Sequence, residues 1–532
     1  MVICLLGGTL IMASSLFGEG EATTGKCLTP FVISARIRPL ENAGLQRRVL
    51  AGRPLNELSA LSPSGKFRIH YDTSSASQNL PAMLDGAGSR IPFSHVQYVD
   101  NVAMIFDSVW IAEIGTFNFP PPPADSNAGG GDEYDVYIQD LGANNFGYTQ
   151  PETEIPDVPA KPNPRWTSYI VIDNDFGIGF RTQGIPAVRV TAAHEFFHAI
   201  QLGDYGLWDD NELYFYELTA EAMESVVFPS VKDYVKDIYT YFNTMDLLSL
   251  YDSNKNLSYG RAIWGVYLVQ RYGIQIMKSI WEQVASQKPF AALDMALLSR
   301  NTSLQQAFAT FALWNFYTGP RADTAHYYKD GALFPPLNIS ESQNVTAKAY
   351  TFQRTAKSYT IQYLRAIRNS DSVYYIVTNV DSKDALAAAH DVFGYTLDVS
   401  PVMTGGWSAL PNGMSYRFVV EDARNWSMVP LQVAGFFSSL ETAPFPNPFD
   451  PKKSSILFPM PAGTRANTML YVFSSSMELV AEASLSAVSI FGKQCYEWNG
   501  RTSKGGFVSS GVYFYVIKAD GIDVRGKIAV VQ

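Results

Sequence analysis

Two spacings of apolar residues follow one another along the chain. Up to residue 335, segments 66–72, 134–138 and 168–172 are predicted strands, as in 66–72, where every second residue is apolar. A helix is predicted from Ser94, a suitable N-cap, to near Gly115. Helical spacing then dominates in five segments: 188–202, 212–227, 231–241, 258–272 and 304–314. Residues 66–335 are therefore predicted to form an α+β domain.

Beyond residue 335 strict alternation takes over. Strands are predicted at 358–366, 372–379, 414–421 and 428–434, so residues 345–440 are expected to form an all-β sandwich. Four prolines between 444 and 451 predict an extended linker. Glycines at 505, 506 and 511 supply tight turns beside a β-branched and aromatic strand at 512–517, which predicts a C-terminal Ig-like β-sandwich over 444–532. The chain is thus expected to be multidomain.

Composition supports several folded units and disfavours one class of partner. With 532 residues, 47% of them hydrophobic and 17% charged, the chain is too apolar for disorder and too long for a single core. Its net charge of −10 disfavours phosphate-rich partners. We therefore expect no nucleic-acid ligand.

The first residues have the character of an export signal. Apolar residues 2–13 are too few to span a bilayer, which needs ~20, but they match the core of a signal peptide that is followed by small residues. We assign 1–22 to a cleaved signal and 23–65 to an N-terminal segment in the position of a propeptide. Cys27 and Cys495 would be the thiols of the exported protein. The predicted signal, together with the lack of a predicted transmembrane span, indicates a secreted or cell-surface protein.

The most specific chemical signal is the sequence His194-Glu195-Phe-Phe-His198. Histidines four residues apart project from one face of a helix and can share a tetrahedral Zn²⁺, with Glu195 placed as a general base. By chance this motif is expected on the order of a few times per thousand such chains. The alternative is an amphipathic helix whose histidines only satisfy hydrogen bonds.

A third ligand is available after a spacer of eighteen residues. Glu217, Glu221 and Glu224 share one face of the predicted helix 212–227 among apolar neighbours, where carboxylates need partners. One carboxylate can bind the metal, and Glu221 can orient a ligand histidine through its free N–H. A solvated acidic stripe is the alternative.

This spacing resembles the gluzincin metallopeptidases, and is closest to their aminopeptidase-like branch. The resemblance implies that His194, His198 and Glu217 bind zinc, that Glu195 is the base, and that Glu221 is the acidic residue behind a ligand. Residues 67–281 are also similar to a family of uncharacterised secreted metalloproteases labelled MXAN. Besides the two helices, the shared features are Phe67-x-Ile69-His70-Tyr71, Asp135-Val-Tyr-Ile138 and Tyr259-Gly260-x-Ala262-Ile263-Trp264.

The gluzincin resemblance also implies an oxyanion donor and a strand that aligns the substrate. Tyr259 or Arg261, at the start of the predicted helix 258–272, is our choice of donor, with helix capping or packing as the alternative and His326 as a weaker candidate. The strand 168–172, shortly before the zinc helix, is expected to be an edge that pairs with an extended peptide.

Two other polar groups are interpreted as structural. Alternation places His70 and Asp72 on one strand face, but nothing in the sequence brings that face to the zinc. The acidic loops 125–135 and 204–210 lack the regular spacing of an EF-hand, so no calcium is assigned.

The C-terminal segment resembles the FlgD-like Ig domain and the related sorting tails of type IX-secreted bacterial proteins. The shared features are Asn447-Pro-Phe-Asp-Pro451, the glycine turns, and Gly526-Lys527 followed by a hydrophobic end. The resemblance implies an export machinery as partner of this tail.

Together these patterns predict a zinc metallopeptidase, an endopeptidase of gluzincin type. It would hydrolyse peptide bonds of a protein or peptide substrate by metal-activated water, with Glu195 as the base. The main alternative is a non-catalytic cell-surface binding or adhesion protein on the same scaffold. A zinc enzyme with another substrate is a third hypothesis.

Overall fold

The computed structural model describes most of the chain in two units. The described residues are 26–30, 32–33, 52–143, 145–156, 163–208, 210–252, 258–345, 348–368, 371–381, 392–402, 405–410, 414–420, 425–433, 444, 449–452, 455–459, 468–490, 493–519 and 522–532. The predicted signal 1–22 lies outside them, as do residues 34–51 of the N-terminal segment and 445–448 of the predicted linker. One unit comprises Met1–Tyr241 and Asp252–Leu304, and the other comprises Phe242–Tyr251 and Gln305–Gln532.

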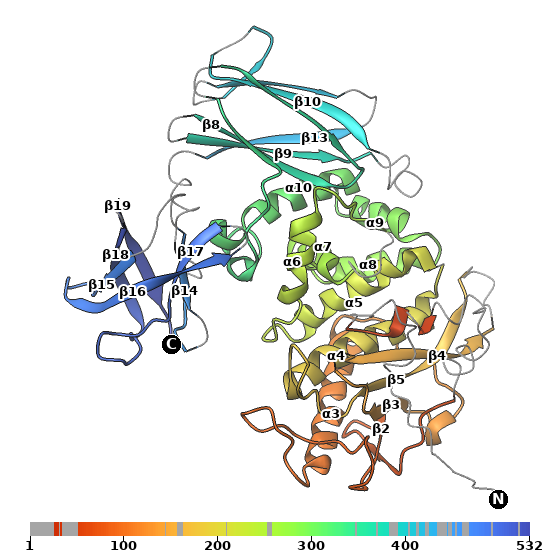
Figure 1. Cartoon of the computed structure of the whole chain (residues 1–532). Coiled ribbons are helices and arrows are strands. Elements are labelled where there is room, and N and C mark those ends of the chain that lie inside the picture. Colours follow the sequence, from red (N-terminus) through yellow and green to blue (C-terminus); the bar gives the residue numbers. More distant parts are fainter. Residues whose placement is uncertain are drawn as a thin grey trace, which may run out of the picture. The chain divides into compact units, whose positions relative to one another are not determined.

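A five-stranded mixed sheet forms the base of the first unit (Figure 1). Its order is β1-β2-β3-β5-β4, with β2, β3 and β5 parallel and with β1 and β4 antiparallel at the two edges. The interior strand β5 is buried along nearly its whole length, as is usual for a strand covered on both faces. The strands are β1 (Leu58–Leu61), β2 (Phe67–Tyr71), β3 (Tyr134–Gln139), β4 (Gly147–Ile155) and β5 (Arg165–Asp173).

The edge strand of the sheet beside α4 is β4, and not the predicted strand 168–172. Segment 168–172 lies within β5 and pairs with β3 on one side and β4 on the other, so the prediction of an edge there is wrong. β4 was not predicted, because its sequence contains a proline and several polar residues. Such residues are depleted in central strands but tolerated at an edge.

Helices cover the sheet and then stack on one another. α3 and α4 pack on strands of the sheet, α5 packs on α4, and α7 packs on α5. The five helical segments predicted up to Tyr272 all contain a helix, whereas α8 and α9 were not predicted. The helices are α3 (His95–Trp110), α4 (Gly184–Ile200), α5 (Leu213–Val227), α6 (Val235–Thr244), α7 (Ala262–Tyr272), α8 (Gln275–Val284) and α9 (Pro289–Leu298).

Two glycines permit the close approach of elements around α4 and α5. A Cβ at Gly147 of β4 would lie 2.8 Å from the carbonyl oxygen of Val171 and 2.9 Å from Thr191 on α4. A Cβ at Gly265 of α7 would lie 2.6 Å from the Cβ of Ala222 on α5. Real Cβ atoms do not approach so closely, so glycine is needed at both contacts.

The second unit contains α10 (Leu304–Phe316), apart from its first residue, and two four-stranded sheets that share a core. Their orders are β11-β12-β10-β7 and β13-β9-β8-β6. The core takes residues from both, such as Phe352 and Leu397 from the first and Val373 and Val377 from the second. The four strands predicted in this region are β8, β9, β12 and β13. The strands are β6 (Glu341–Asn344), β7 (Tyr350–Ala356), β8 (Ile361–Arg368), β9 (Asp371–Asn379), β10 (Phe393–Ser400), β11 (Ser408–Ala409), β12 (Ser415–Val420) and β13 (Trp426–Val433).

The C-terminal part has a six-stranded antiparallel sheet with its own core. Its order is β14-β17-β16-β15-β18-β19, and the predicted strand 512–517 lies within β18. Phe449, at the end of the predicted linker, is buried in this core and pairs with Val530. The strands are β14 (Ile456–Pro459), β15 (Thr468–Phe473), β16 (Leu479–Ile490), β17 (Lys493–Trp498), β18 (Gly511–Ala519) and β19 (Ile522–Val530).

The described part of the chain is therefore a mixed helical and β protein with several sheets and eight α-helices. None of these helices combines the length and the apolar character that crossing a membrane requires.

Candidate metal centre

Two buried helices carry the predicted ligands. Every residue of α4 from Val190 to Ile200 is buried, so this helix lies in the core of its unit and not on its surface. His194 and His198 are one turn apart on α4, and Glu217 projects from α5, which packs against it. The alternative of a solvated acidic stripe is wrong, because Glu217, Glu221 and Glu224 are each at most 1% exposed.

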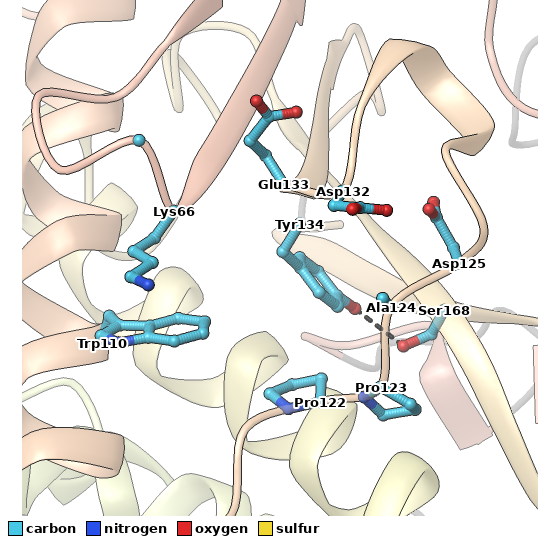
Figure 2. A pocket seen from close by; sticks show the side chains of 11 residues that line it. Lys66, Trp110, Pro122, Pro123, Ala124, Asp125, Asp132, Glu133, Tyr134 and Ser168 are labelled. Carbon is cyan, nitrogen blue, oxygen red and sulfur yellow. Dashed lines mark hydrogen bonds between the residues drawn. The ribbon is translucent and has the colours of Figure 1, made fainter.

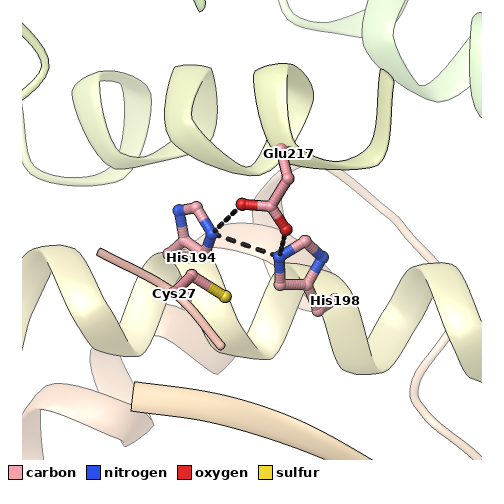
Figure 3. Close-up of side chains that lie close together, drawn as sticks. All are labelled: Cys27, His194, His198 and Glu217. Carbon is pink, nitrogen blue, oxygen red and sulfur yellow. Dashed lines mark hydrogen bonds and ion pairs between the residues drawn. The ribbon is translucent and has the colours of Figure 1, made fainter. Parts of the chain in front are cut away.

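The structure brings the three predicted ligands together (Figure 3). The Nε2 atoms of His194 and His198 are 3.1 Å apart. Glu217 Oε1 lies 2.9 Å from Nε2 of His198, and its Oε2 lies 3.4 Å from Nε2 of His194. Two ligands held at ~2.0–2.1 Å by a tetrahedral zinc ion stand roughly 3.3 Å apart, so these spacings fit shared coordination.

The outer nitrogens of both histidines are occupied. Nδ1 of His198 lies 2.7 Å from Oε1 of Gln201, whose amide nitrogen donates to the carbonyl oxygen of Tyr216 and to Thr219 Oγ1. The amide oxygen of Gln201 is therefore an acceptor, and Nδ1 of His198 is the donor. Nδ1 of His194 lies 2.8 Å from Oε1 of Glu224.

This pattern of donors turns the acceptor atoms of the site toward one another. With the protons on Nδ1, the two Nε2 atoms direct lone pairs at each other across 3.1 Å. Oε2 of Glu217 is buried and has no hydrogen-bond partner among the described residues. The residues present thus fit a divalent metal such as zinc.

A buried lysine stands behind the carboxylates of α5. Nζ of Lys26 lies 2.6 Å from Oε1 of Glu224, 3.2 Å from Glu221 and 2.8 Å from Asp233. Burial opposes ionisation, but Lys26 and then His194 lower the pKa of Glu221 to about 2. Lys26 and, less strongly, Arg181 hold the pKa of Asp233 well below its usual value against the same effect of burial.

Glu221 was predicted to orient a ligand histidine, but Glu224 lies closer than Glu221 to the outer nitrogen of His194. Oε2 of Glu221 lies 3.6 Å from Nδ1 of His194, whereas Oε1 of Glu224 is at 2.8 Å. Lys26 contacts both oxygens of Glu224, and Nδ1 of His194 lies within hydrogen-bond distance of one of them.

The two residues predicted for catalysis both contact the N-terminal segment. Oε2 of Glu195 accepts hydrogen bonds from Thr29 Oγ1 and Thr149 Oγ1, each at 2.9 Å. The hydroxyl of Tyr259 accepts from the N–H of Cys27 at 3.1 Å and donates to its carbonyl oxygen at 3.2 Å. Burial raises the pKa of Tyr259 well above its usual value, so this hydroxyl stays a neutral donor.

The other candidates for the oxyanion donor have partners elsewhere. The guanidinium of Arg261 donates to the carbonyl oxygen of Asp252 and lies 5.3 Å from the ring centre of Tyr214. His326 belongs to the second unit, where its exposed imidazole lies 2.7 Å from Asp323. Of the three candidates, Tyr259 is the one with a ring beside a ligand, 6.2 Å from that of His194.

The groups interpreted as structural form local networks. His70 lies 2.7 Å from Asp135 and stacks on Tyr137. Asp72 accepts hydrogen bonds from neighbouring side chains, among them that of Asn56. In the acidic loop 125–135, two aspartates pair with the guanidinium of Arg53.

Sequence reasoning missed three contributors to the cluster. Cys27 and Lys26 lie far from the motif in sequence, and only the fold brings them to it. Gln201 lies three residues after His198, in a π-helical turn (Gln201–Tyr205) that continues α4. That spacing was a usable signal, because residues three apart on a helix are neighbours.

A separate cavity of about 310 Å³ is lined by none of the candidate metal ligands (Figure 2). Within it, the hydroxyl of Tyr134 lies 2.7 Å from Ser168 Oγ, and Nζ of Lys66 lies 5.2 Å from the ring centre of Trp110. The remaining lining residues are Gly65, Pro122, Pro123, Ala124, Asp125, Asp132 and Glu133.

Comparisons with known proteins give a match of a family model to part of the chain and a distant structural similarity. Residues 175–362 match a family model described as a family of unknown function, DUF6055. A search of curated proteins finds no match. Among solved structures, the chain is similar at 13% identity to PorZ, described as an essential bacterial surface component of the type-IX secretion system of Porphyromonas gingivalis. That similarity covers 32% of this chain and only 23% of the other, with a TM-score of 0.14. The residues matched by the family model include α4, α5 and Tyr259.

Proposed function

We propose that this protein is a zinc-dependent peptidase of gluzincin type with a zincin-like first unit. The observation that supports it best is the pair of buried Nε2 atoms at 3.1 Å beside Glu217, each imidazole fixed from behind by a hydrogen-bond acceptor. Zinc bound there supplies a Lewis acid that activates water and polarises a carbonyl group.

The chain's own residues then handle protons and charge. Glu195, held by Thr149, accepts a proton from water and delivers it to the leaving amine. Tyr259 donates its hydroxyl hydrogen to the oxygen on which negative charge develops. Both side chains lie in the same buried region as the ligands.

An extended peptide is the substrate class that the surroundings favour. β4 is an edge strand, and Thr149 on it contacts Glu195 directly. A chain that pairs with β4 through its backbone therefore passes beside the metal cluster. Backbone pairing at an edge accepts many sequences, which suits a protease.

The proposal includes the remaining expectations for the whole chain. The shared core of the two four-stranded sheets supports an accessory sandwich, and the separate core of the C-terminal sheet supports an Ig-like sorting or anchoring domain. On this basis we propose a secreted or cell-surface protein whose tail engages an export machinery.

The test combines metal analysis with one conservative substitution. The full-length protein is expected to hold one zinc per chain, and His198→Ala and Glu217→Ala are expected to lose it. Hydrolysis of casein and of a peptide library is compared in Cys27→Ala, chosen because Cys27 lies within the cluster, and in Cys27→Ala with Glu195→Gln. The second variant should keep zinc and lose ~10²–10⁴-fold in rate.

A protein that holds no zinc and hydrolyses nothing would overturn the proposal. Zinc at full occupancy without hydrolysis of any peptide would instead favour the non-catalytic binding protein.

A further inference from the structure

We propose that residues Lys26 to Thr29 hold this enzyme in a latent state, with the thiolate of Cys27 as the fourth ligand of the metal. The inference rests on the proposed function and concerns the regulation of the same site. The side chains of Lys26, Cys27 and Thr29 and the backbone of the segment carry it.

The thiol of Cys27 lies inside the ligand cluster. Its Sγ and one ligand atom each from His194, His198 and Glu217 all lie within 4.8 Å of one another (Figure 3). Cys27 is only 5% exposed. Catalytic zinc sites keep three protein ligands and one open position, whereas four protein ligands close the site. When Cys27 binds, its thiol gives up its proton to solvent and fills the position that water needs.

The backbone of the segment pairs with the edge of β4. Cys27 forms a parallel bridge with Gly147 of β4. The N–H of Leu28 donates to the carbonyl oxygen of Gly147 at 3.1 Å, and the N–H of Phe146 donates to that of Lys26 at 2.9 Å. An extended substrate would need this same edge, so the segment excludes it.

The segment also forms hydrogen bonds with the two side chains proposed for catalysis. Thr29 donates its hydroxyl to Glu195, and Tyr259 is engaged by the N–H and carbonyl groups of Cys27. Because the thiolate takes the place of water, the carbonyl of Cys27 can contact Tyr259 without being attacked. Metal, base and oxyanion donor are thus all covered by one short stretch of chain.

Lys26 anchors the segment. Its ammonium is buried among Glu221, Glu224 and Asp233, which belong to α5 and to the loop before α6. These carboxylates lie in the core and need a cation there. The contacts of Lys26 with these three carboxylates indicate that the segment binds specifically at this position.

The first test identifies the ligand without measuring activity. Cobalt is loaded in place of zinc into full-length native protein, Cys27→Ala and the matched thiol control Cys495→Ala, and metal content and absorption spectra are recorded. Native protein and Cys495→Ala should show a thiolate-to-cobalt charge-transfer band. Cys27→Ala should bind one cobalt and lack that band.

A second measurement uses only the native chain. Alkylation of Cys27 by iodoacetamide, followed by peptide mass spectrometry, should be slow in the metal-loaded protein and faster after chelation. Equal labelling in the two states contradicts coordination by Cys27, whether or not any variant folds.

The third measurement tests latency. Peptide hydrolysis by Cys27→Ala should exceed that of native protein and Cys495→Ala by at least ~10-fold, since the rate scales with the fraction of open sites. Adding Glu195→Gln to Cys27→Ala should abolish the gain.

The outcomes separate the two proposals. Metal bound without a charge-transfer band in native protein overturns the role of Cys27 and leaves the proposed function standing. A band in native protein with equal hydrolysis by native protein and Cys27→Ala overturns latency and leaves the proposed function standing, whereas a band with hydrolysis by neither overturns both. If neither the native protein nor the variants bind metal, the proposed function itself is overturned.

Discussion

The two histidines on α4 are fixed by partners of different kinds. His194 faces the carboxylate of Glu224, which Lys26 contacts, whereas His198 faces the neutral amide of Gln201. A carboxylate raises the basicity of an imidazole more than an amide does, so the amide mainly fixes orientation. The amide of Gln201 can therefore be removed without changing the charge of the site.

Gln201→Leu is expected to weaken metal binding by ~10–100-fold, because His198 loses the acceptor that holds its tautomer and ring orientation. Competition against a chromophoric chelator measures the affinity. Gln275→Leu, which removes an exposed amide on α8 that donates to the carbonyl oxygen of Phe117, is the control and should leave affinity unchanged. Equal affinities of the two variants would show that His198 needs no such partner.

At this scale the sequence predicted what is local and missed what is distant. His194 and His198 follow from helical spacing, and Glu217 lies on the next helix, so a spacer of fixed length sufficed. Cys27 reaches the cluster only because its backbone pairs with β4, and no spacing within the sequence encodes that pairing. Lys26 was invisible for the same reason, although the buried carboxylates of α5 required a cation somewhere.

Among the elements, α5 is packed against two other helices of the first unit. It lies between α4, which carries the histidines, and α7, whose Gly265 meets Ala222. Any increase in the distance between α5 and α7 is transmitted to Glu217 on the same helix. The position of Glu217 is therefore expected to depend on a contact between two small residues.

Gly265→Ala is expected to destabilise the first unit by about 1–3 kcal/mol through overpacking, although alanine is otherwise the better helix former. Adding Ala222→Gly should restore part of the loss by removing the opposing methyl group. Urea unfolding of the two single variants and the double variant gives the coupling energy. Strictly additive effects would mean that the contact between Gly265 and Ala222 contributes no coupling energy.

The elements themselves were predictable to different degrees. Helices and strands with a clear period, such as α4 and β9, were found within a few residues of their ends. β4 was missed because proline and polar residues hide an edge strand, and its absence led to the wrong choice of edge. α9 is apolar on most sides, so no helical period stands out in its sequence.

At the scale of the whole molecule, the proposed chemistry is confined to one unit. His194, His198, Glu217 and Cys27 all belong to the first unit, whereas the shared sandwich core and the core of the C-terminal sheet belong to the second. A ligand that binds only the native first unit can stabilise only that unit.

Chelation is therefore expected to lower one calorimetric transition and leave the others in place. At a free metal concentration a thousandfold above the Kd, the loss amounts to about 4 kcal/mol. Scans with and without chelator, and of His198→Ala as the matched control, measure it. A uniform shift of every transition would contradict confinement of the metal to the first unit.

The burial of Lys26 has a consequence for leakage through the latent state. If the segment leaves, three buried carboxylates lose their shared cation, and breaking a buried ion pair in this way costs about 3–5 kcal/mol. Since 1.4 kcal/mol corresponds to a factor of ten, this anchor alone would keep the open form at roughly one molecule in 10² to 10⁴. Background turnover before activation would thus depend on a lysine that touches neither metal nor substrate, in addition to the thiolate of Cys27.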